Sequence, residues 1–513
     1  MSSRPAATIR RARVARWAVP VGLTLVALAL RLAGLSRPHE LLFDETYYVK
    51  DAWSVLTLGY EGSWPDDGDA AFEAGDVGAL SPEGSFVAHP PFGKWLIALG
   101  LAALGPETAW GWRISTALIG AALVPLLYAV ARRITGSVAF AGLAGGLLAL
   151  DGLGISMSRI ALLDTPLSFL VLLALWFALL DRPGTTARIA SGAQRDRVAG
   201  PVVWRRPWIV AAGLTLGCAA SVKWSALYAL AVLGVALVVA DALDRRRAGV
   251  RAWAPSAIGR QGPATFALLV PPAFLAYLAT WTGWLATSGG YGRDGSANPL
   301  LALWDYQRAV YRFHVGVQSP HTYQSPAWEW PLLVHPTLMS RSEQPSCALG
   351  ESCVSVVAAL PNPLVWWLSM IAVVWLVVRL LRQAVRRTRL DGRAAFVLLG
   401  VAATFAPWLL YPSRTTFFFY AVAMLPYAIL ALVVVLQHLW RAREPVLLPD
   451  PSPAEVEWAA REAKDRTAAW RQTVVVVTVL AFAVGLFFLP FATGSPLPFL
   501  LYRAHLWLPT WYL

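Results

Sequence analysis

The residues best suited to chemistry are an adjacent acidic pair, Asp44 and Glu45, within the run FDETYY at residues 43–48. Neighbouring carboxylates repel each other, which raises the free-energy cost of ionising both. One carboxylate of such a pair can act as a general base toward a hydroxyl while the other binds or orients a substrate. The same dipeptide also suits the solvated start of a helix, so a catalytic and a structural role both stay open.

A second polar run, HPPFGKW at residues 89–95, contains His89 and Lys94. Its two prolines stiffen the backbone, and its glycine permits close approach of another segment. Lys94 can meet a lipid headgroup or a phosphate. It can equally serve as an interface anchor beside Trp95, and the run alone does not separate these roles.

Five further charged residues lie singly at the ends of apolar segments: Arg113, Arg159, Asp164, Lys223 and Arg414. A charge next to hydrocarbon is costly and usually has a partner or a ligand. The cations among them suit a lipid-linked phosphate, which Arg and Lys would hold, while a carboxylate deprotonates an acceptor. For each residue alone a structural salt bridge, such as Arg159 with Asp164 or Asp151, explains the position equally well.

The elements that must position these residues are membrane-spanning helices. The chain is 57% hydrophobic and 14% charged, with a mean hydropathy of +0.53, whereas soluble domains are about 25% charged. Apolar runs near the ~20 residues that cross a bilayer predict about eleven spans. These spans cover roughly residues 17–36, 110–130, 138–156, 165–181, 207–222, 224–240, 264–285, 361–378, 394–410, 416–437 and 472–490.

The basic residues are distributed unevenly between the two sides that these spans define. With the N-terminus on the inside, 30 of the 43 Lys and Arg residues fall in the inner segments. Lys and Arg collect on the cytoplasmic side of membrane proteins, so we expect a cytoplasmic N-terminus and, with an odd number of spans, an outer C-terminus. The net charge of +13 therefore reflects topology, and a nucleic-acid partner is disfavoured.

Three segments depart from short connections. Residues 37–108 form an acidic outer loop that ends in an apolar stretch near 95–104, too short to span and expected at the interface. Residues 286–360 form an outer loop rich in Trp, Tyr, His and Pro. Residues 441–471 are cytoplasmic, rich in proline at their start and then helical in pattern from Glu455 to Arg471, as expected of a helix lying on the membrane surface. The predicted division is a transmembrane catalytic domain over 1–440, and a C-terminal region over 441–513 with that surface helix, the last span and an aromatic interfacial tail.

The chain has three cysteines. Cys347 and Cys353 share the second outer loop, where a small disulfide is compatible with an oxidising compartment. Cys218 lies inside a span and is expected to be a core residue. The spacing of Cys and His predicts no metal site, and we expect no cofactor.

Five motifs follow one another along the chain: the Asp-Glu pair of the first loop, the HPPxGK run, Arg113, SRIALLD at 158–164 and SVKW at 221–224. Their order and spacings resemble those of the protein O-mannosyltransferases, glycosyltransferase family 39, of the GT-C class of membrane glycosyltransferases. The resemblance extends from about residue 20 to 440, and the Arg-rich, Lys-poor composition is similar to that of actinobacterial members. It implies an all-α polytopic GT-C fold.

The resemblance also implies an activity. Family members transfer mannose from polyprenyl-phosphate mannose to Ser or Thr hydroxyls of secreted or membrane proteins emerging from translocation, on the outer face of the cell membrane, by one inverting displacement. No metal is implied. The implied roles are catalytic base for Asp44, site-organising carboxylate for Glu45, donor-phosphate binding for Arg113, Lys223 and, more loosely, Arg414, and shaping of the site for His89, Lys94, Arg159 and Asp164.

One departure leaves the acceptor open. Eukaryotic members carry a β-rich domain in a later outer loop, whereas residues 286–360 are too few for one. The acceptor is therefore expected at the first loop or the aromatic segment around His321–His335. A related transferase acting on a lipid or cell-wall polymer remains an alternative. A transporter or flippase is disfavoured, because charges concentrate at the outer span ends and no internal repeat is evident.

Overall fold

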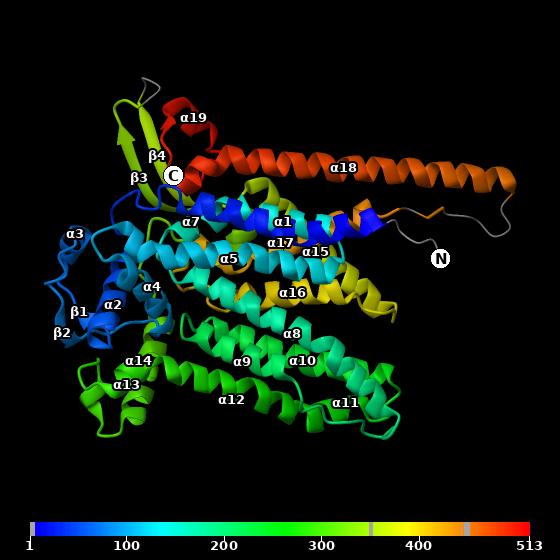
Figure 1. Cartoon of the computed structure of the whole chain (residues 1–513), viewed down its shortest axis with the longest axis horizontal. Helices are drawn as coiled ribbons and strands as arrows, with labels where there is room; N and C mark the ends of the chain where they lie inside the picture. The colour runs from blue at the N-terminus through cyan, green and yellow to red at the C-terminus, as the bar shows by residue number, and fades with distance from the viewer. Residues whose placement is uncertain (1–5, 348–351, 443, 446–451) are drawn as a thin grey trace.

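The computed structural model describes residues 6–347, 352–442, 444–445 and 452–513. Most of these residues are helical, and the long helices run side by side along one direction (Figure 1). The helices are α1 (Ala6–Leu32), α2 (Glu45–Leu58), α3 (Gly68–Glu73), α4 (Phe92–Leu104), α5 (Ala109–Thr135), α6 (Val138–Ala149), α7 (Gly152–Arg159), α8 (Asp164–Ala193), α9 (Pro207–Ala220), α10 (Ala226–Arg247), α11 (Trp253–Ser256), α12 (Gly262–Thr280), α13 (Thr282–Ala286), α14 (Pro299–Gly316), α15 (Pro363–Val385), α16 (Gly392–Thr404), α17 (Leu425–Trp440), α18 (Pro453–Thr493) and α19 (Phe499–Ala504).

The predicted spans all fall on helices of this bundle. By length and composition, six described helices are apolar enough to cross a membrane, or seven if the bent pair α6–α7 counts as one span; α9, α16 and α17 are apolar but shorter. The bend between α6 and α7, 53°, comes at Asp151. Its carboxylate caps α7 by accepting a hydrogen bond from Gly154 N at 3.0 Å and also accepts one from Asn362 N. Asp151 is thus the N-cap of α7.

Two small antiparallel sheets interrupt the helical architecture, which the all-α prediction lacked. β1 (Gly62–Ser63) pairs with β2 (Ser81–Gly84) in the first loop. β3 (Thr337–Gln344) pairs with β4 (Cys353–Ala359), which pairs with β5 (Leu497–Pro498). The disulfide between Cys347 and Cys353 is present and links the start of β4 to the segment that follows β3.

The first loop folds into a compact layer at one end of the bundle, where α2, α3, α4 and the β1–β2 sheet lie together, with α13 and α14 beside them (Figure 1). Helix α4 packs closely on α5 because both helices have glycine at the contact. A Cβ on Gly100 would lie 2.4 Å from the Gly111 carbonyl oxygen, so only glycine permits this approach. The 95–104 stretch, expected only to lie at the interface, therefore also fixes the first loop on the helix bundle.

Helix α18 corrects the predicted surface helix. The structure joins that helix and the last span into one helix of 41 residues, which extends well past the other helices (Figure 1). A capping box at Ser452 and Glu455 starts it, and its only internal proline is Pro490, near its end. At ~1.5 Å per residue it is about twice as long as the ~30 Å hydrocarbon layer. With no breaker between the two parts, the first part continues the span and does not turn onto the surface.

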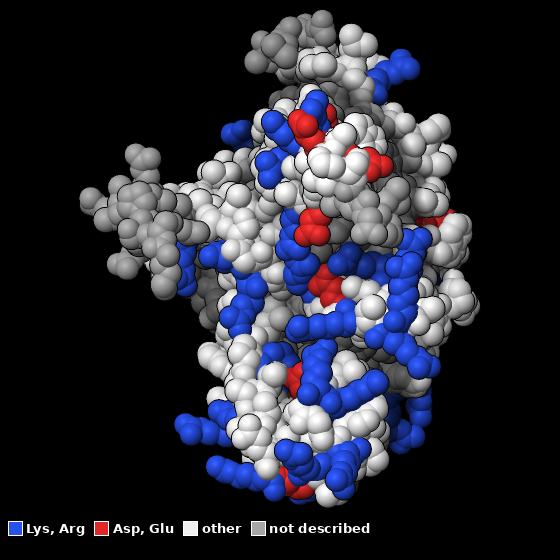
Figure 2. Space-filling view, turned by 90° about the vertical axis from the view of Figure 1, so that its right-hand side faces the viewer, with Lys and Arg blue, Asp and Glu red and all other residues white. Residues whose placement is uncertain are grey.

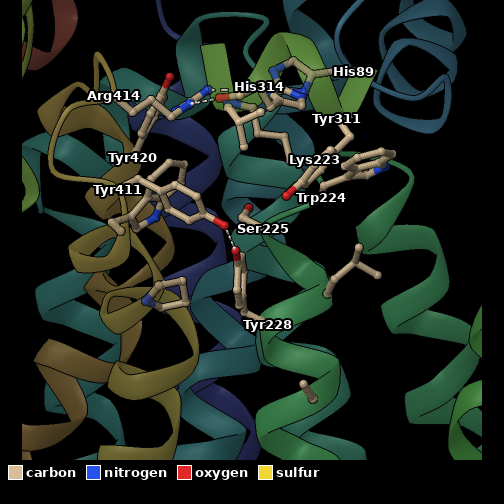
Figure 3. Close-up of a pocket in the computed structure, with 15 residues that line it drawn as sticks. His89, Lys223, Trp224, Ser225, Tyr228, Tyr311, His314, Tyr411, Arg414 and Tyr420 are labelled. Carbon is tan, nitrogen blue, oxygen red and sulfur yellow. Dashed lines mark hydrogen bonds between the residues drawn. The ribbon is translucent and has the colours of Figure 1, made fainter. Parts of the chain in front are cut away.

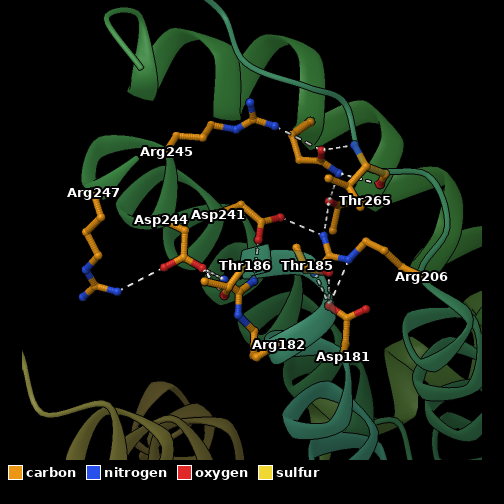
Figure 4. Close-up of polar contacts among 12 residues, drawn as sticks. Asp181, Arg182, Thr185, Thr186, Arg206, Asp241, Asp244, Arg245, Arg247 and Thr265 are labelled. Carbon is orange, nitrogen blue, oxygen red and sulfur yellow. Dashed lines mark hydrogen bonds and ion pairs between the residues drawn. The ribbon is translucent and has the colours of Figure 1, made fainter. Parts of the chain in front are cut away.

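Lys and Arg gather at the end of the bundle opposite the first loop (Figure 2). Beneath this basic end, a buried ion-pair network joins α8, α9 and α10 (Figure 4). Arg206 bridges Asp181 and Asp241, each with an N–O distance of 2.7 Å, and Arg182 pairs with Asp241 and Asp244. A buried charge is stable only when it is paired in this way. The network therefore fixes the helix ends farthest from the acidic pair, while membrane orientation remains a prediction.

Candidate active site

Asp44 occupies the position before the first turn of α2 and is half-buried. Tyr48, one turn on, donates a hydrogen bond from its hydroxyl to Asp44 Oδ2 at 3.1 Å. Within the described ranges no donor reaches Oδ1, which leaves one carboxylate oxygen free to accept a proton. Burial raises the pKa of the Asp44 carboxyl, against the opposing charge of Lys223. A carboxylate of higher basicity with a free oxygen is suited to act as a general base.

The residue before Asp44 has a strained backbone. Phe43 has φ of 54°, in the left-handed region that non-glycine residues rarely adopt. Its ring packs against His321, Phe417 and Phe419, with centroid distances of 5.5, 5.1 and 5.4 Å. Such strain costs about 1–3 kcal/mol and persists where the surroundings over-determine the conformation. The packing therefore ties Asp44 to the two segments, distant in sequence, that carry those rings.

Glu45 has a different environment, although it is the next residue. Its side chain is fully buried, and both of its oxygens are bound by Arg113, at 2.9 Å from Nε and 2.7 Å from Nη2. Its oxygens also accept hydrogen bonds from Ala161 N at 2.6 Å and Leu42 N at 2.9 Å. A carboxylate with four donors is a structural anchor, and this geometry does not support contact with a substrate.

Arg113 is the partner that anchors Glu45, and it does not lie at the phosphate site expected for it. Its five N–H groups are all used, two by Glu45 and three by the carbonyls of Leu35, Pro38 and Glu40. No N–H remains for a donor phosphate, and Arg113 does not line the cavity described below. The structure thus places Arg113 beneath the first loop as a clamp.

Lys223 lies between α9 and α10, close to the start of α8. Its Nζ donates to Asp164 Oδ2 at 2.7 Å and lies 4.8 Å from the centroid of the Tyr420 ring. Asp164 takes one of the three N–H donors of the ammonium, so others are available to a ligand. Asp164 therefore contributes by orienting Lys223.

A cavity of about 470 Å³ opens beside Lys223, within the usual size range for small-ligand sites (Figure 3). Its upper wall is polar, and its lower wall along α10 is mainly apolar. The lining comes from α10 and the residues just before it, from α14, from the short helical turn Ala406–Leu410 and from the segments that carry His89, Arg414 and Tyr420. The residues are His89, Lys223, Trp224, Ser225, Leu227, Tyr228, Ala231, Tyr311, His314, Val315, Pro407, Trp408, Tyr411, Arg414 and Tyr420.

Arg414 is the second cation of this cavity. Its Nε donates to the carbonyl oxygen of His314 at 3.1 Å, and its guanidinium lies 5.5 Å from the Trp408 ring. Nη1 is buried and has no partner among the described residues. A buried, unpaired guanidinium N–H is costly, which favours an anionic ligand at this position.

His89 and His314 face each other across the polar wall, with ring centroids 5.2 Å apart. Burial is the main cause that holds the pKa of His89 well below its usual value and lowers that of His314 to about 4. Both rings are therefore neutral at physiological pH and can exchange hydrogen bonds with hydroxyls. His89 Nδ1 is buried without a partner in the described part of the chain.

The other two residues expected to shape the site, Lys94 and Arg159, do not line the cavity. Lys94 Nζ donates to the His89 carbonyl at 2.9 Å and pairs with Glu61 at 2.7 Å and Asp51 at 3.3 Å. Arg159 forms neither salt bridge considered for it. It binds carbonyls at the end of α1, including Ala33 O at 2.6 Å.

Sequence reasoning missed His314 and the tyrosines of the cavity, since they lie in segments without a recognised motif. The aromatic and His-rich composition of residues 286–360 was the available signal for His314. The structure thus brings Asp44, His89, Lys94, Asp164, Lys223 and Arg414 to one region and separates Glu45, Arg113 and Arg159 from it.

Two family models match this chain. The family model described as dolichyl-phosphate-mannose-protein mannosyltransferase matches residues 82–278, and that of the C-terminal four-TMM region of protein-O-mannosyltransferase matches residues 300–511. A polyprenol-phosphate-mannose–protein mannosyltransferase of Mycolicibacterium smegmatis is 30% identical, covering 97% of this chain and 93% of the relative. The protein of that name from Mycobacterium tuberculosis is 31% identical, covering 97% and 92%.

The chain belongs to the protein O-mannosyltransferase family. The solved structure of the Saccharomyces cerevisiae protein O-mannosyltransferase Pmt1-Pmt2 complex, bound to the sugar donor, matches with a TM-score of 0.69 at 14% identity, covering 97% of this chain and 93% of that one. This likeness shows that the fold is shared. The predicted GT-C fold and membrane glycosyltransferase class are confirmed.

Proposed function

We propose that this protein O-mannosyltransferase transfers mannose from polyprenyl-phosphate mannose to Ser and Thr hydroxyls of polypeptides, at the outer face of the cell membrane. The observation that carries the proposal is the cavity with two cations, Lys223 and Arg414, beside a half-buried Asp44 with one free oxygen. The relatives are named polyprenol-phosphate-mannose–protein mannosyltransferases, which supports polyprenyl-phosphate mannose as the donor.

The proposed reaction is one displacement at the anomeric carbon. The acceptor oxygen forms the new C–O bond while its proton passes to Asp44 Oδ1. The bond from the anomeric carbon to the phosphate oxygen breaks, and its electron pair leaves with the polyprenyl phosphate. Lys223 and Arg414 stabilise the negative charge that develops on the phosphate, which is the main electrostatic contribution to such a step. Attack opposite the leaving group inverts the sugar configuration.

A transfer assay tests the function. Membranes containing the protein are incubated with labelled polyprenyl-phosphate mannose and a Ser/Thr-containing peptide, and we expect label on the peptide hydroxyls. Label that appears only in lipid or in a cell-wall polymer would overturn the polypeptide acceptor and favour the alternative transferase.

Arg414→Ala should raise the KM for the donor roughly tenfold to a hundredfold, because one hydrogen bond to a charged group contributes about 1.5–3 kcal/mol. The peptide KM should stay near that of wild type. Arg312→Ala is the matched control, since Arg312 is exposed on α14 and does not line the cavity. An unchanged donor KM in Arg414→Ala would remove this residue from the phosphate site.

The lower wall of the cavity offers a path for the donor's apolar chain. A second, apolar groove of about 660 Å³ runs between α10 and α12 and shares Leu227 and Ala231 with the cavity. Exposed apolar side chains, among them Val235 and Phe266, line this groove. A polyprenyl tail leaving the cavity along α10 would enter it without crossing polar surface.

Ala231→Phe tests this path. Ala231 is exposed, so the larger ring should be tolerated by the fold yet obstruct the groove. We expect the KM for a long-chain donor to rise about fivefold or more, while a farnesyl-phosphate mannose should be affected much less. Val374→Phe on α15, also exposed toward the surroundings, is the control. Equal effects on both donors would exclude this path for the tail.

The pH dependence follows from the environment of Asp44. The base must be deprotonated, so the rate should fall as pH falls through its raised pKa. The Tyr48 hydrogen bond favours the charged carboxylate and lowers this pKa. Tyr48→Phe should therefore move the acid limb of the kcat profile to higher pH. An acid limb that does not move would show that the group titrating in the kcat profile is not Asp44.

A further inference from the structure

A small polar cleft of about 190 Å³ lies on the outer side of Arg414. It is formed by two segments, residues 318–326 and 412–416, and we call it the outer cleft. Hydrogen bonds hold the two segments together: Ser325 N donates to Thr416 O at 2.7 Å, and Gln324 pairs with Phe417 in an isolated antiparallel bridge. The Thr416 hydroxyl also donates to Ser325 O at 2.8 Å. The walls of the outer cleft are thus fixed before any ligand arrives.

The outer cleft presents polar groups that the fold itself does not use. The side-chain amides of Gln318 and Gln324 and the hydroxyl of Ser413 are exposed, and none has a hydrogen-bond partner in the part of the chain that the structure describes. A glutamine amide both donates and accepts, as a peptide group does. The cleft can therefore hydrogen-bond the backbone of another chain.

The outer cleft is joined to the candidate active site at two points. Arg414 lines both the cleft and the donor cavity. The segments that form the cleft continue into His321 and Phe417, whose rings pack on Phe43, the residue before Asp44. A chain held in the cleft would thus lie beside Asp44, on the other side of Arg414 from the proposed donor.

We propose that the outer cleft binds the backbone of an extended polypeptide acceptor next to its reactive Ser or Thr. This inference rests on the proposed function and deepens it by assigning the acceptor site. A polypeptide fits better than a lipid, because the lining is polar and exposed, unlike the apolar wall of the donor cavity. Pre-fixed walls and unused amide groups suit short extended segments of varied sequence, since backbone groups are common to all of them.

Kinetics of the double variant Gln318→Ala/Gln324→Ala test the assignment. Both side chains are exposed and make no hydrogen bond within the described part of the chain, so the fold should be retained. We expect the KM for a Ser/Thr peptide to rise about fivefold for each hydrogen bond lost, while kcat and the donor KM stay near wild type. Gln194→Ala is the control, because Gln194 is an exposed glutamine at the end of α8, at the basic end of the bundle. A peptide KM unchanged in the double variant would overturn the assignment of the outer cleft as the acceptor site.

A second measurement separates this inference from the proposed function. A photo-crosslinking residue placed at position 324 should capture a peptide in which Ser and Thr are replaced by Ala, since binding there needs no reaction. Capture without peptide mannosylation by wild type would refute the proposed function and leave the cleft as a peptide site. No capture at position 324 would refute the outer cleft as a peptide site. An equal KM rise for a lipid-linked acceptor in the double variant would refute it as well.

Discussion

Asp44→Asn is expected to lower kcat for mannose transfer by roughly 10²–10⁴-fold, the usual contribution of a general base. Asparagine keeps the size and the hydrogen bond from Tyr48 but cannot take the acceptor proton. The half-buried carboxylate has one oxygen without a donor among the described residues and a pKa raised by burial. The measurement is the transfer rate at saturating donor and peptide in membranes with matched amounts of protein.

The control for this prediction is Asp66→Asn. Asp66 lies in the same outer loop and is exposed, so its substitution removes an equal charge from the same face and should leave the rate unchanged. Thermal unfolding of both variants should match wild type, because neither carboxylate closes a buried ion pair. Wild-type activity in Asp44→Asn would overturn the assignment of the base.

Arg113→Ala should have the second large effect, on stability. It leaves Glu45 buried and unpaired, and removing one partner of a buried ion pair costs about 3–5 kcal/mol. Three carbonyls of the first loop would also lose their donors. We expect a lower Tm in detergent or nanodiscs and a loss of activity that follows the folded fraction, with an unchanged donor KM in what remains.

The matched control is Arg341→Ala, which breaks an exposed pair with Glu343 at the surface. Exposed pairs contribute about 0–1 kcal/mol, so its Tm should stay close to wild type. Arg113→Lys keeps the charge but not the two-pronged contact with Glu45, and should lie between wild type and Arg113→Ala. A normal Tm with a raised donor KM in Arg113→Ala would return this residue to the phosphate site.

Much of the fold could be predicted from local composition. The spans predicted from apolar runs all lie on helices. The basic clusters predicted one charged end of the bundle, which Figure 2 displays. Helix continuity was harder to predict. The pattern from Glu455 to Arg471 predicts a separate surface helix, but no proline lies between Pro453 and Pro490, so this stretch and the last span form the single helix α18. The β3–β4 hairpin was missed because its strands pair in the middle of a long loop.

The motifs by themselves predicted that the acidic pair and the scattered cations of this membrane glycosyltransferase gather at one end of the helix bundle. Only the tertiary structure decided what each one contacts. Asp44 and Glu45 are neighbours in the chain, yet α2 begins between them and turns one toward the cavity region and the other onto Arg113. A side chain's partners come from distant segments, as Arg414 with His314 illustrates. Local sequence therefore sets the end of the helix bundle at which a side chain lies, and packing sets its partners.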